Sequence, residues 1–515
     1  MVYQPSNKYL QKRAFLFSLI VTIGCCVLKQ VTKEVIEAAH SIGLFVHVCV
    51  SDMGTANQDM WRTVGVYSGR TGCTNHIQHP CSDQHQLYFM ADTPHLLKNV
   101  RNCLLNQSVL LPQHIVSSAS LPSDCVTLSH VRELVKVQDD KQLKLVPNLT
   151  AAHVSPGQYQ KMRVNTAAAV LSHTTASALQ FCVAVNIMPK EAETTAWFID
   201  CVNKWFDAMN ARTIKASLFP TSQGKVNALH LLLDVIRNVR FTGRDSWKPI
   251  QTGIQLSTVT VLDLFNDLVC QGNYKFLITG RLTQDCVENF FSCIRGKGDS
   301  HPSPVHFRQN LRVVSLSQFM QITPLSSYDI DDSVYFLDFL KTKPVRTVQD
   351  VDDEFVFVDE HVSLLHTNLD ILDTNVCYLL AGWTVHKQKA RIAVICGSPC
   401  DAPAEAQLMM IKTYGGLSYP SELVYKAVQV AESVFRCHQG ELALTSNVEH
   451  KLNSMFSNRF SVDGLPPCHS VLSDIISRYF RLRIHIHGKW ITSQCKAAAA
   501  VQHGSRSAFC RTKVK

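Results

Sequence analysis

Apolar residues first form a strand-like pattern over residues 44–50, where β-branched and aromatic residues dominate. We expect this strand to deliver Asp52 to the edge of a sheet, where open α/β folds carry their polar functional groups. A second short strand is predicted over residues 86–90. Over residues 95–105 the apolar positions recur at helical spacing, so a helix is expected to follow the second strand.

An apolar run over residues 14–28 follows three basic residues near the N-terminus, an arrangement that also occurs in signal peptides. The run has no clear small-residue cleavage site and is too short to span a bilayer. The pattern therefore favours a strand that leads into a helix over residues 25–40.

Helical spacing dominates residues 104–240, and from about residue 335 the sequence changes to Asp-rich spacers and short elements. A helical block between two α/β segments is typical of an inserted domain. Helices are predicted over residues 162–185, 192–212, 225–240, 257–268 and 286–294.

The composition is that of a globular chain, because 46% of the 515 residues are apolar and 18% are charged. The formal net charge of +9 permits nucleic-acid binding without requiring it. The nineteen cysteines are odd in number and scattered, which indicates free thiols rather than a disulfide framework. After Asp474 every charged residue is basic, so the tail could contact DNA phosphates or lie in solvent.

Two acids stand three residues apart in the segment 281–291. Asp285 and Glu288 would share one face of a helix, and the following Phe290–Phe291 pair would anchor that helix in a core. Paired acids on a rigid helix can hold a divalent metal ion. Taken alone, such a pair is more typical of a solvated helix face.

The segment 281–291 resembles the catalytic-glutamate motif of P-element-type transposases, a group that includes THAP-domain relatives. The resemblance continues through residues 294–298 and 302–308, with two departures. Thr283 stands where Asn is usual, and Asp299 stands where a second Gly is usual.

Four other blocks resemble the same family in the same order along the chain. One contains Asp52, another begins at Asp92 with the sequence Asp-Thr-Pro-His, and two belong to the C-terminal part. The resemblance therefore covers nearly the whole chain. The matching blocks are residues 50–57, 92–101, 375–383 and 412–421.

The resemblance implies an α/β plus α fold. An incomplete ribonuclease-H-like fold would be interrupted by a mostly helical GTP-binding insertion domain and followed by a C-terminal mixed domain. The implied ranges are residues 1–103 for the first ribonuclease-H-like part, 104–240 for the insertion, 241–330 for the second part and 335–515 for the C-terminal domain.

In this family three carboxylates bind two metal ions, which activate water or a DNA 3′-hydroxyl. Asp52 matches the second acid and Glu288 the third, so the resemblance makes both of them catalytic ligands of Mg²⁺. The first-strand aspartate would fall before Met1, and no Asp precedes Asp52. We therefore expect an N-terminally truncated nuclease fold that is inactive by itself, because two carboxylates hold a metal pair poorly.

The family's insertion domain binds GTP with Mg²⁺, and this chain has no P-loop. A carboxylate at Asp207 suits guanine, which offers two adjacent N–H donors that adenine lacks. An ordinary helix with a buried Phe and solvated polar residues is the alternative. The resemblance implies nucleotide contacts for Lys144, Lys161, Phe206, Asp207, Asn210 and Asp285.

Lys98 and Arg101 lie on one side of the helix predicted over residues 95–105, where they could contact DNA phosphates or solvent. Two groups of Cys and His residues raise the separate possibility of a zinc-dependent interaction module, although their spacing is not that of common zinc fingers. These groups are Cys73, His76, His79 and Cys81, and Cys396, Cys400, Cys437 and His438.

The sequence thus predicts a P-element-like DNA transposase remnant that cleaves and joins DNA with Mg²⁺ and the help of GTP. A domesticated, non-catalytic protein that binds DNA and GTP is the first alternative, and the zinc module is the second. The implied partners are transposon-end DNA, GTP and a second copy of the chain through self-association. We expect no membrane association and a nuclear location.

Overall fold

The computed structural model describes residues 25–243, 246–296, 302–320, 369–387, 404–414, 416–440, 447–460 and 472–511. The chain divides into two compact units. The first unit contains the described residues up to 283 and from 369 onward, and the second contains those from 284 to 320. The strand predicted within the apolar run 14–28 lies outside the described residues.

A three-stranded sheet in the order β1-β5-β4 forms the α/β part of the first unit. Strand β1 (Val48–Ser51) pairs in parallel with β5 (Ser82–Ala91), and β4 (His76–His79) pairs antiparallel with the other side of β5. Both predicted strands are confirmed, and β5 is longer than its prediction. The ribonuclease-H-like strand order stays a prediction.

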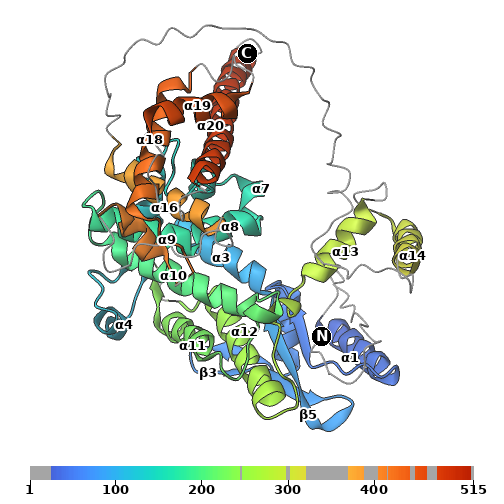
Figure 1. The fold of residues 1–515 in the computed structure, drawn as a ribbon. Coiled ribbons are helices and arrows are strands. Elements are labelled where there is room, and N and C mark those ends of the chain that lie inside the picture. The colour runs from blue at the N-terminus through green and yellow to red at the C-terminus, as the bar shows by residue number, and fades with distance from the viewer. Residues whose placement is uncertain are drawn as a thin grey trace. The chain divides into compact units, whose positions relative to one another are not determined.

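Helices cover this sheet, as Figure 1 shows. The predicted helices before β1 and after β5 are confirmed as α1 (Cys25–Ser41) and α3 (Thr93–Asn106). Helix α12 (Pro249–Phe265) packs on β5, where its Ser257 hydroxyl donates to the Ala91 carbonyl oxygen at 2.9 Å. The smaller elements between β1 and β4 are α2 (Thr55–Thr63), β2 (Tyr67–Gly69) and β3 (Gly72–Thr74).

The helical region between the two α/β segments begins and ends at a second small sheet. Strand β6 (Val109–Leu110) pairs antiparallel with both β7 (Cys125–Val126) and β8 (Arg240–Phe241). Val109 faces Phe241, so the two ends of the helical region lie side by side. This pairing is what an insertion requires, although the boundaries 104 and 240 themselves stay a prediction.

Helix α10 (Ala192–Met209) is the central helix of this region. Its Trp205 is fully buried and donates an indole hydrogen bond of 2.8 Å to Thr258 of α12. The predicted helix over 162–185 is broken at Leu171 and Ser172 into two helices. The other helices are α4 (Gln113–Ser118), α5 (Leu128–Val137), α6 (Ala151–Val154), α7 (Gln158–Lys161), α8 (Val164–Val170), α9 (His173–Ala184) and α11 (Gln223–Asn238).

The segment Val164–Ala184 is long and apolar enough to cross a membrane by length and hydropathy alone. In this protein 56% of that window is buried inside the unit, as expected for core helices of a folded domain.

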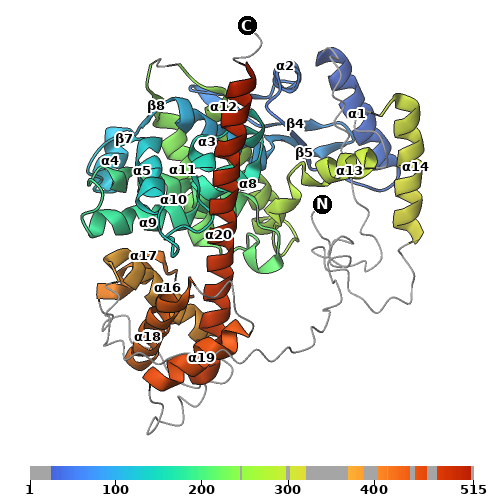
Figure 2. The same cartoon turned by 90° about the horizontal axis from the view of Figure 1, so that it is seen from above.

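The described C-terminal residues of the first unit form a group of helices that we call the C-terminal bundle. Helix α20 runs beside α16, α18 and α19 (Figure 2). No strand occurs among these described residues, and the predicted mixed C-terminal domain stays a prediction. The bundle consists of α16 (Ile371–Lys387), α17 (Gln407–Lys412), α18 (Glu422–His438), α19 (Val448–Arg459) and α20 (Leu472–Arg511).

Gly382 allows a close contact inside the C-terminal bundle. It lies inside α16, and a Cβ atom built there would come within 2.3 Å of the Ser418 carbonyl oxygen. The glycine is therefore required for the close approach of the segment before α18.

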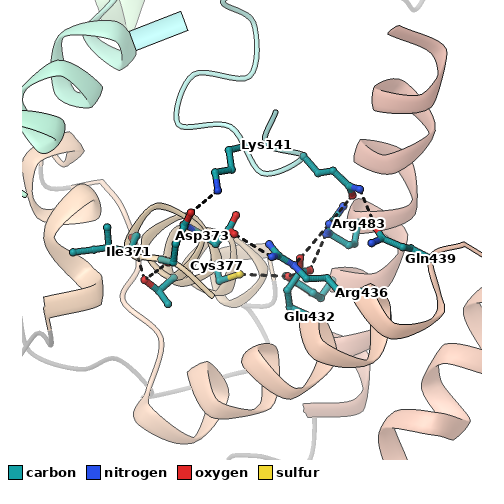
Figure 3. Close-up of polar contacts among 12 residues, drawn as sticks. Lys141, Ile371, Asp373, Cys377, Glu432, Arg436, Gln439 and Arg483 are labelled. Carbon is teal, nitrogen blue, oxygen red and sulfur yellow. Dashed lines mark hydrogen bonds and ion pairs between the residues drawn. The ribbon is translucent and has the colours of Figure 1, made fainter. Parts of the chain in front are cut away.

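A buried charge network holds the C-terminal bundle together (Figure 3). Glu432 of α18 is fully buried and accepts hydrogen bonds of 2.7 Å from Arg436 Nε and 2.7 Å from Arg483 Nε. The Tyr479 hydroxyl donates to the same carboxylate at 2.8 Å, and Arg436 also contacts Asp373 of α16 at 3.0 Å. Because each buried charge has an opposite partner, the network links α16, α18 and α20 firmly.

The second unit consists of two helices, α13 (Asp285–Arg295) and α14 (Pro304–Met320). Phe291 and Phe307 pack between them with ring centroids 6.1 Å apart, and the fully buried Ile294 accepts a hydrogen bond of 3.3 Å from Asn310. The predicted helix over 286–294 is confirmed, with its aromatic residues packed against the next helix.

Candidate functional site

Asp52 lies at the carboxyl end of β1, where the sequence placed it. Its Oδ1 atom accepts hydrogen bonds from the Gly54 amide at 2.8 Å and from Asn57 Nδ2 at 2.7 Å. A Cβ atom at position 54 would lie 2.8 Å from that same oxygen, so Gly54 leaves room for the contact. The side chain is thus held in one orientation at the sheet edge while remaining half-buried rather than enclosed.

A second carboxylate lies at the end of the neighbouring parallel strand. The Asp92 amide donates to the Ser51 carbonyl oxygen at 2.8 Å, which places Asp92 beside the end of β1. Its side chain is 2% exposed and contacts His95 Nδ1 at 2.6 Å and the His95 amide at 3.1 Å. The sequence prediction of site residues missed this aspartate–histidine pair, although an Asp directly after a buried strand was the available signal.

Asp285 and Glu288 occupy the first turn of α13 in the second unit, on the shared face that their spacing predicted. The partial positive charge at the N-terminus of a helix stabilises acidic side chains in its first turn. Glu288 is exposed and Asp285 is half-buried. Asp52 and Glu288 belong to different units, so their meeting in one active site stays a prediction, as does a shared site for Asp285 and Asp207.

Carboxylate oxygens are the ligands that Mg²⁺ prefers. Within the described part of the chain, no three His, Cys, Asp or Glu side chains lie close enough together to hold a metal ion. The described arrangement therefore does not complete a metal site, and no catalytic step through Mg²⁺ follows from it.

The first predicted zinc group is contradicted by the same finding. Its residues are spread along β3, β4 and the following turn, and alternate residues of a strand point to opposite faces. His79 is already engaged, with Nε2 3.1 Å from the Val46 carbonyl oxygen and Nδ1 accepting from the Cys81 amide at 3.1 Å. In the second group, Cys396 and Cys400 lie outside the described residues.

The DNA contact predicted for Arg101 needs correction. Arg101 is fully buried in α3, and its Nη2 donates to the carbonyl oxygens of Gln160 at 3.4 Å and Lys161 at 3.1 Å. Burial also lowers the pKa of its guanidinium. Arg101 therefore positions the segment that carries Lys161, and Lys98, only 9% exposed on the same helix, offers little surface to a phosphate.

Lys144 lies in an irregular loop that follows α5. The buried Gln138 side chain fixes this loop, because it donates to the Val146 carbonyl oxygen at 3.1 Å and accepts from the Val146 amide at 3.0 Å. Leu143 and Leu145 on either side of Lys144 are buried, whereas Lys144 is half-buried. The loop thus presents one basic residue from a fixed backbone.

The residues predicted to recognise the base lie at the carboxyl end of α10. Asp207 is exposed and accepts a hydrogen bond of 2.9 Å from Asn203 one turn earlier. Asn210 follows at the helix end, and its buried Oδ1 atom has no hydrogen-bond partner among the described residues. Phe206, which directly precedes Asp207, is half-buried. The exposed carboxylate of Asp207 could accept from adjacent N–H donors of a ligand, whereas the Asn210 oxygen is enclosed by the protein.

Comparisons with known proteins show what this chain is similar to. Residues 94–221 match the family described as a TNP-like, GTP-binding insertion domain. The chain is 24% identical to the transposable element P transposase of Drosophila melanogaster, over 96% of this chain and 65% of that protein. It is 24% identical to the DNA transposase THAP9 of Homo sapiens, over 79% of this chain and 48% of that protein.

Among solved structures the chain is similar to the Drosophila P element transposase strand transfer complex. The TM-score is 0.50 and the identity 23%, covering 56% of this chain and 64% of that one. This likeness shows the fold. The chain spans less than two thirds of the length of either sequence relative. These similarities confirm the predicted resemblance to P-element-type transposases, and the match of residues 94–221 confirms the resemblance to a GTP-binding insertion domain.

Proposed function

From this homology to P-element-type transposases, we propose that the protein binds GTP through its insertion domain and acts on DNA as a transposase relative. The observation that carries the proposal is the match of residues 94–221 to a GTP-binding insertion domain. The exposed carboxylate of Asp207 on α10 supports it independently.

In this proposal Asp207 and Asn210 recognise the base. Guanine presents N1–H and N2–H₂ donors on one edge, and a carboxylate accepts from both, whereas adenine offers no matching pair. Lys144 and Lys161 supply positive charge to the phosphates, and ammonium groups pair strongly with phosphate oxygens. Phe206 would pack beside the nucleotide, and Mg²⁺ would accompany it on the phosphates.

The DNA chemistry is the less constrained half of the proposal. Asp52 and Glu288 would be the carboxylates that hold Mg²⁺ for cleavage and strand transfer at transposon ends, in the nucleus, with self-association of the chain at the paired ends. The alternative is a non-catalytic protein that binds DNA and GTP. The two functions share the nucleotide site and differ only in the use of the acidic residues.

Base preference tests the nucleotide site. Replacing Asp207 by Ala leaves guanine donors without a partner, at a cost of about 1–3 kcal/mol. Asp207→Ala should therefore weaken GTP binding roughly ten- to hundredfold and leave ATP binding nearly unchanged. Calorimetric titration of the purified chain with each nucleotide measures both affinities. The control Glu193→Ala removes an exposed acid from the opposite end of the same helix and should change neither.

Equal affinity of the unaltered chain for GTP and ATP would contradict the proposed site. The acidic residues are tested by nicking of plasmid DNA in Mg²⁺. Any cleavage by the chain should be abolished in both Asp52→Asn and Glu288→Gln. Cleavage that survives both changes would refute their assignment, and GTP binding without cleavage would favour the non-catalytic alternative.

A further inference from the structure

Two segments of the insertion domain carry the proposed nucleotide contacts, and each of them is held by the C-terminal bundle. The exposed face of α10 carries Asp207, and the loop after α5 carries Lys144. Each segment makes polar contacts with residues more than 200 positions further along the chain. These contacts lie within the first unit.

The contact on the α10 side centres on Tyr414, which follows α17. Its hydroxyl donates to Asp200 Oδ1 at 2.8 Å and lies 2.7 Å from His173 Nδ1. The His173 ring stacks on the Tyr414 ring with centroids 4.1 Å apart, and Lys204 contacts Asp200 at 2.7 Å. We call these four residues the Tyr414 cluster.

The Tyr414 cluster lies on the same face of α10 as the proposed base contact. Asp200, Lys204 and Asp207 are spaced by four and three residues, so they follow one another along one side of the helix. Burial and the hydrogen bond to Asp200 raise the pKa of the Tyr414 hydroxyl, and the charge of Asp207 raises it further, so Asp207 acts on this side chain electrostatically. The Tyr414 residue as a whole is nevertheless 64% exposed.

The contact on the loop side centres on Gln142, two residues before Lys144. Gln142 Oε1 accepts from Arg483 Nη2 at 2.9 Å and lies 3.2 Å from His487 Nδ1, while its Nε2 donates to Gln439 at 2.9 Å. The preceding Lys141 forms an ion pair with Asp370 at the start of α16. We call this set the Gln142 cluster.

The Gln142 cluster is anchored in the buried charge network of the bundle. Arg483 is 1% exposed and bonds to Glu432 through Nε at 2.7 Å and Nη2 at 3.1 Å. The same Nη2 reaches Gln142, so the loop ends on a side chain that the core fixes in place. A buried, doubly bonded arginine has little freedom to follow a moving loop, so it defines where the loop lies.

We propose that the C-terminal bundle supports nucleotide binding by positioning two segments of the nucleotide site. Tyr414 is the positioning residue for Asp207, and Gln142 is the positioning residue for Lys144. This inference rests on the proposed GTP site. Nucleotide binding then requires both segments in the positions that the bundle sets, and binding stabilises the docked bundle in return. Such coupling is reciprocal by thermodynamic necessity.

Two conservative changes remove the contacts while keeping the packing. Tyr414→Phe keeps the ring that stacks on His173 and removes only the hydroxyl. Gln142→Leu keeps a side chain of similar size and removes three hydrogen-bonding contacts. Each change should weaken binding of fluorescent GTP roughly five- to tenfold, because a net hydrogen bond contributes about 1 kcal/mol. Tyr67→Phe is the matched control, because among the described residues that hydroxyl bonds only to the nearby Thr71, at 2.8 Å, so its loss should leave GTP binding unchanged.

Hydrogen exchange supplies the reciprocal measurement. Saturating GTP should slow amide exchange in peptides from α16, α18 and α20 of the unaltered chain, and less so in Tyr414→Phe and Gln142→Leu. A purely structural role would lower the protection of these helices in the absence of GTP and leave the GTP-induced change the same. Circular dichroism checks that each variant is folded.

The outcomes separate the two proposals. If the unaltered chain binds GTP, but both variants bind it with the same affinity and GTP leaves the bundle's exchange unchanged, the coupling is refuted while the GTP site stands. If the unaltered chain binds no GTP, both proposals fail. Weakened binding with altered protection supports the coupling.

Discussion

The charge network around Glu432 gives the most quantitative expectation for this protein. Glu432 is fully buried, and its two oxygens accept four hydrogen bonds from three side chains. Glu432→Gln keeps the shape but removes the charge. It also replaces one acceptor oxygen with an NH₂ group that faces other donors. In place of Oε1 this group would face Arg436 and Arg483, and in place of Oε2 it would face Tyr479 and Arg483.

The cost follows from the burial of Arg483, which is 1% exposed and has no other acid within bonding distance among the described contacts. Removing one partner of a buried ion pair typically costs about 3–5 kcal/mol, because the other charge stays buried without compensation. Arg436 retains Asp373 at 3.0 Å, so most of the loss falls on Arg483. We expect the C-terminal bundle to be destabilised by about 3 kcal/mol at neutral pH.

Native-state hydrogen exchange with peptide mass spectrometry measures this locally, which matters in a chain of several units. Amides of α16, α18 and α20 should lose protection together. Glu422→Gln is the matched control on the same helix, since its ion pair with Lys426 is 2.7 Å long but 81% exposed on the glutamate side. Such surface pairs contribute little to stability, because both charges remain solvated.

A loss of less than about 1 kcal/mol in Glu432→Gln, equal to that of the control, would show that water or a rearranged side chain satisfies Arg483. Coupled replacement by apolar residues provides a second check. Glu432→Leu combined with Arg483→Met should be less damaging than Glu432→Leu alone, because the double change leaves no buried charge.

Three further expectations concern pH and backbone packing. Burial raises the pKa of Asp200, but the hydrogen bonds from its partners outweigh this effect and lower the pKa to about 2. The ionised carboxylate therefore contributes about 2 kcal/mol of stability above pH 4, and this contribution is lost as the pH falls toward 2. Urea denaturation of Asp200→Asn should lack that pH dependence. Burial and two neighbouring histidines lower the pKa of His47 from 6.5 to about 4. As the pH falls, the unfolded chain takes up the proton before the folded chain does, so stability should fall between pH 6.5 and 4. In His47→Gln the plot of stability against pH should be flatter over this range. Gly382→Ala should cost about 1–3 kcal/mol because the new methyl group meets a backbone carbonyl oxygen, whereas Gly488→Ala, with open space around it in α20, should stabilise the helix by up to about 1 kcal/mol in the same assay. Equal effects of the two glycine changes would contradict the packing argument.

Local pattern was a good guide to the elements of the first unit. The β-branched run before Asp52 contains β1, which begins at Val48 rather than at residue 44, and the helical spacing after β5 appears as α3, because each segment repeats apolar residues at the spacing of its element. The predicted helix over 162–185 did not reveal its break at Ser172. A serine inside an apolar helix pattern reads as a tolerated polar residue, whereas here its hydroxyl accepts from the Thr175 amide at 3.2 Å and starts α9.

Contacts between distant segments could not be predicted in this way. Helical spacing places Arg101 beside Lys98 but does not indicate that α7 covers the Arg101 guanidinium. The spacing therefore does not distinguish this buried positioning residue from a DNA contact. The aspartate–histidine pair at Asp92 and the C-terminal clusters around Gln142 depend on neighbours that periodicity does not specify. Resemblance to the family supplied the nucleotide residues, because no local spacing distinguishes Asp207 from an ordinary surface acid.

The contact between Gln142 and Arg483 also has a consequence for biosynthesis. The two residues are 341 positions apart, so the loop emerges from the ribosome roughly 20–70 s before the arginine that fixes it. During that interval the amide group of Gln142 is hydrated, and its loop lacks the side of the fold formed by α20. The loop can therefore reach its final position only after α20 has been synthesised, and a chain arrested before residue 472 would lack the partner that fixes Gln142.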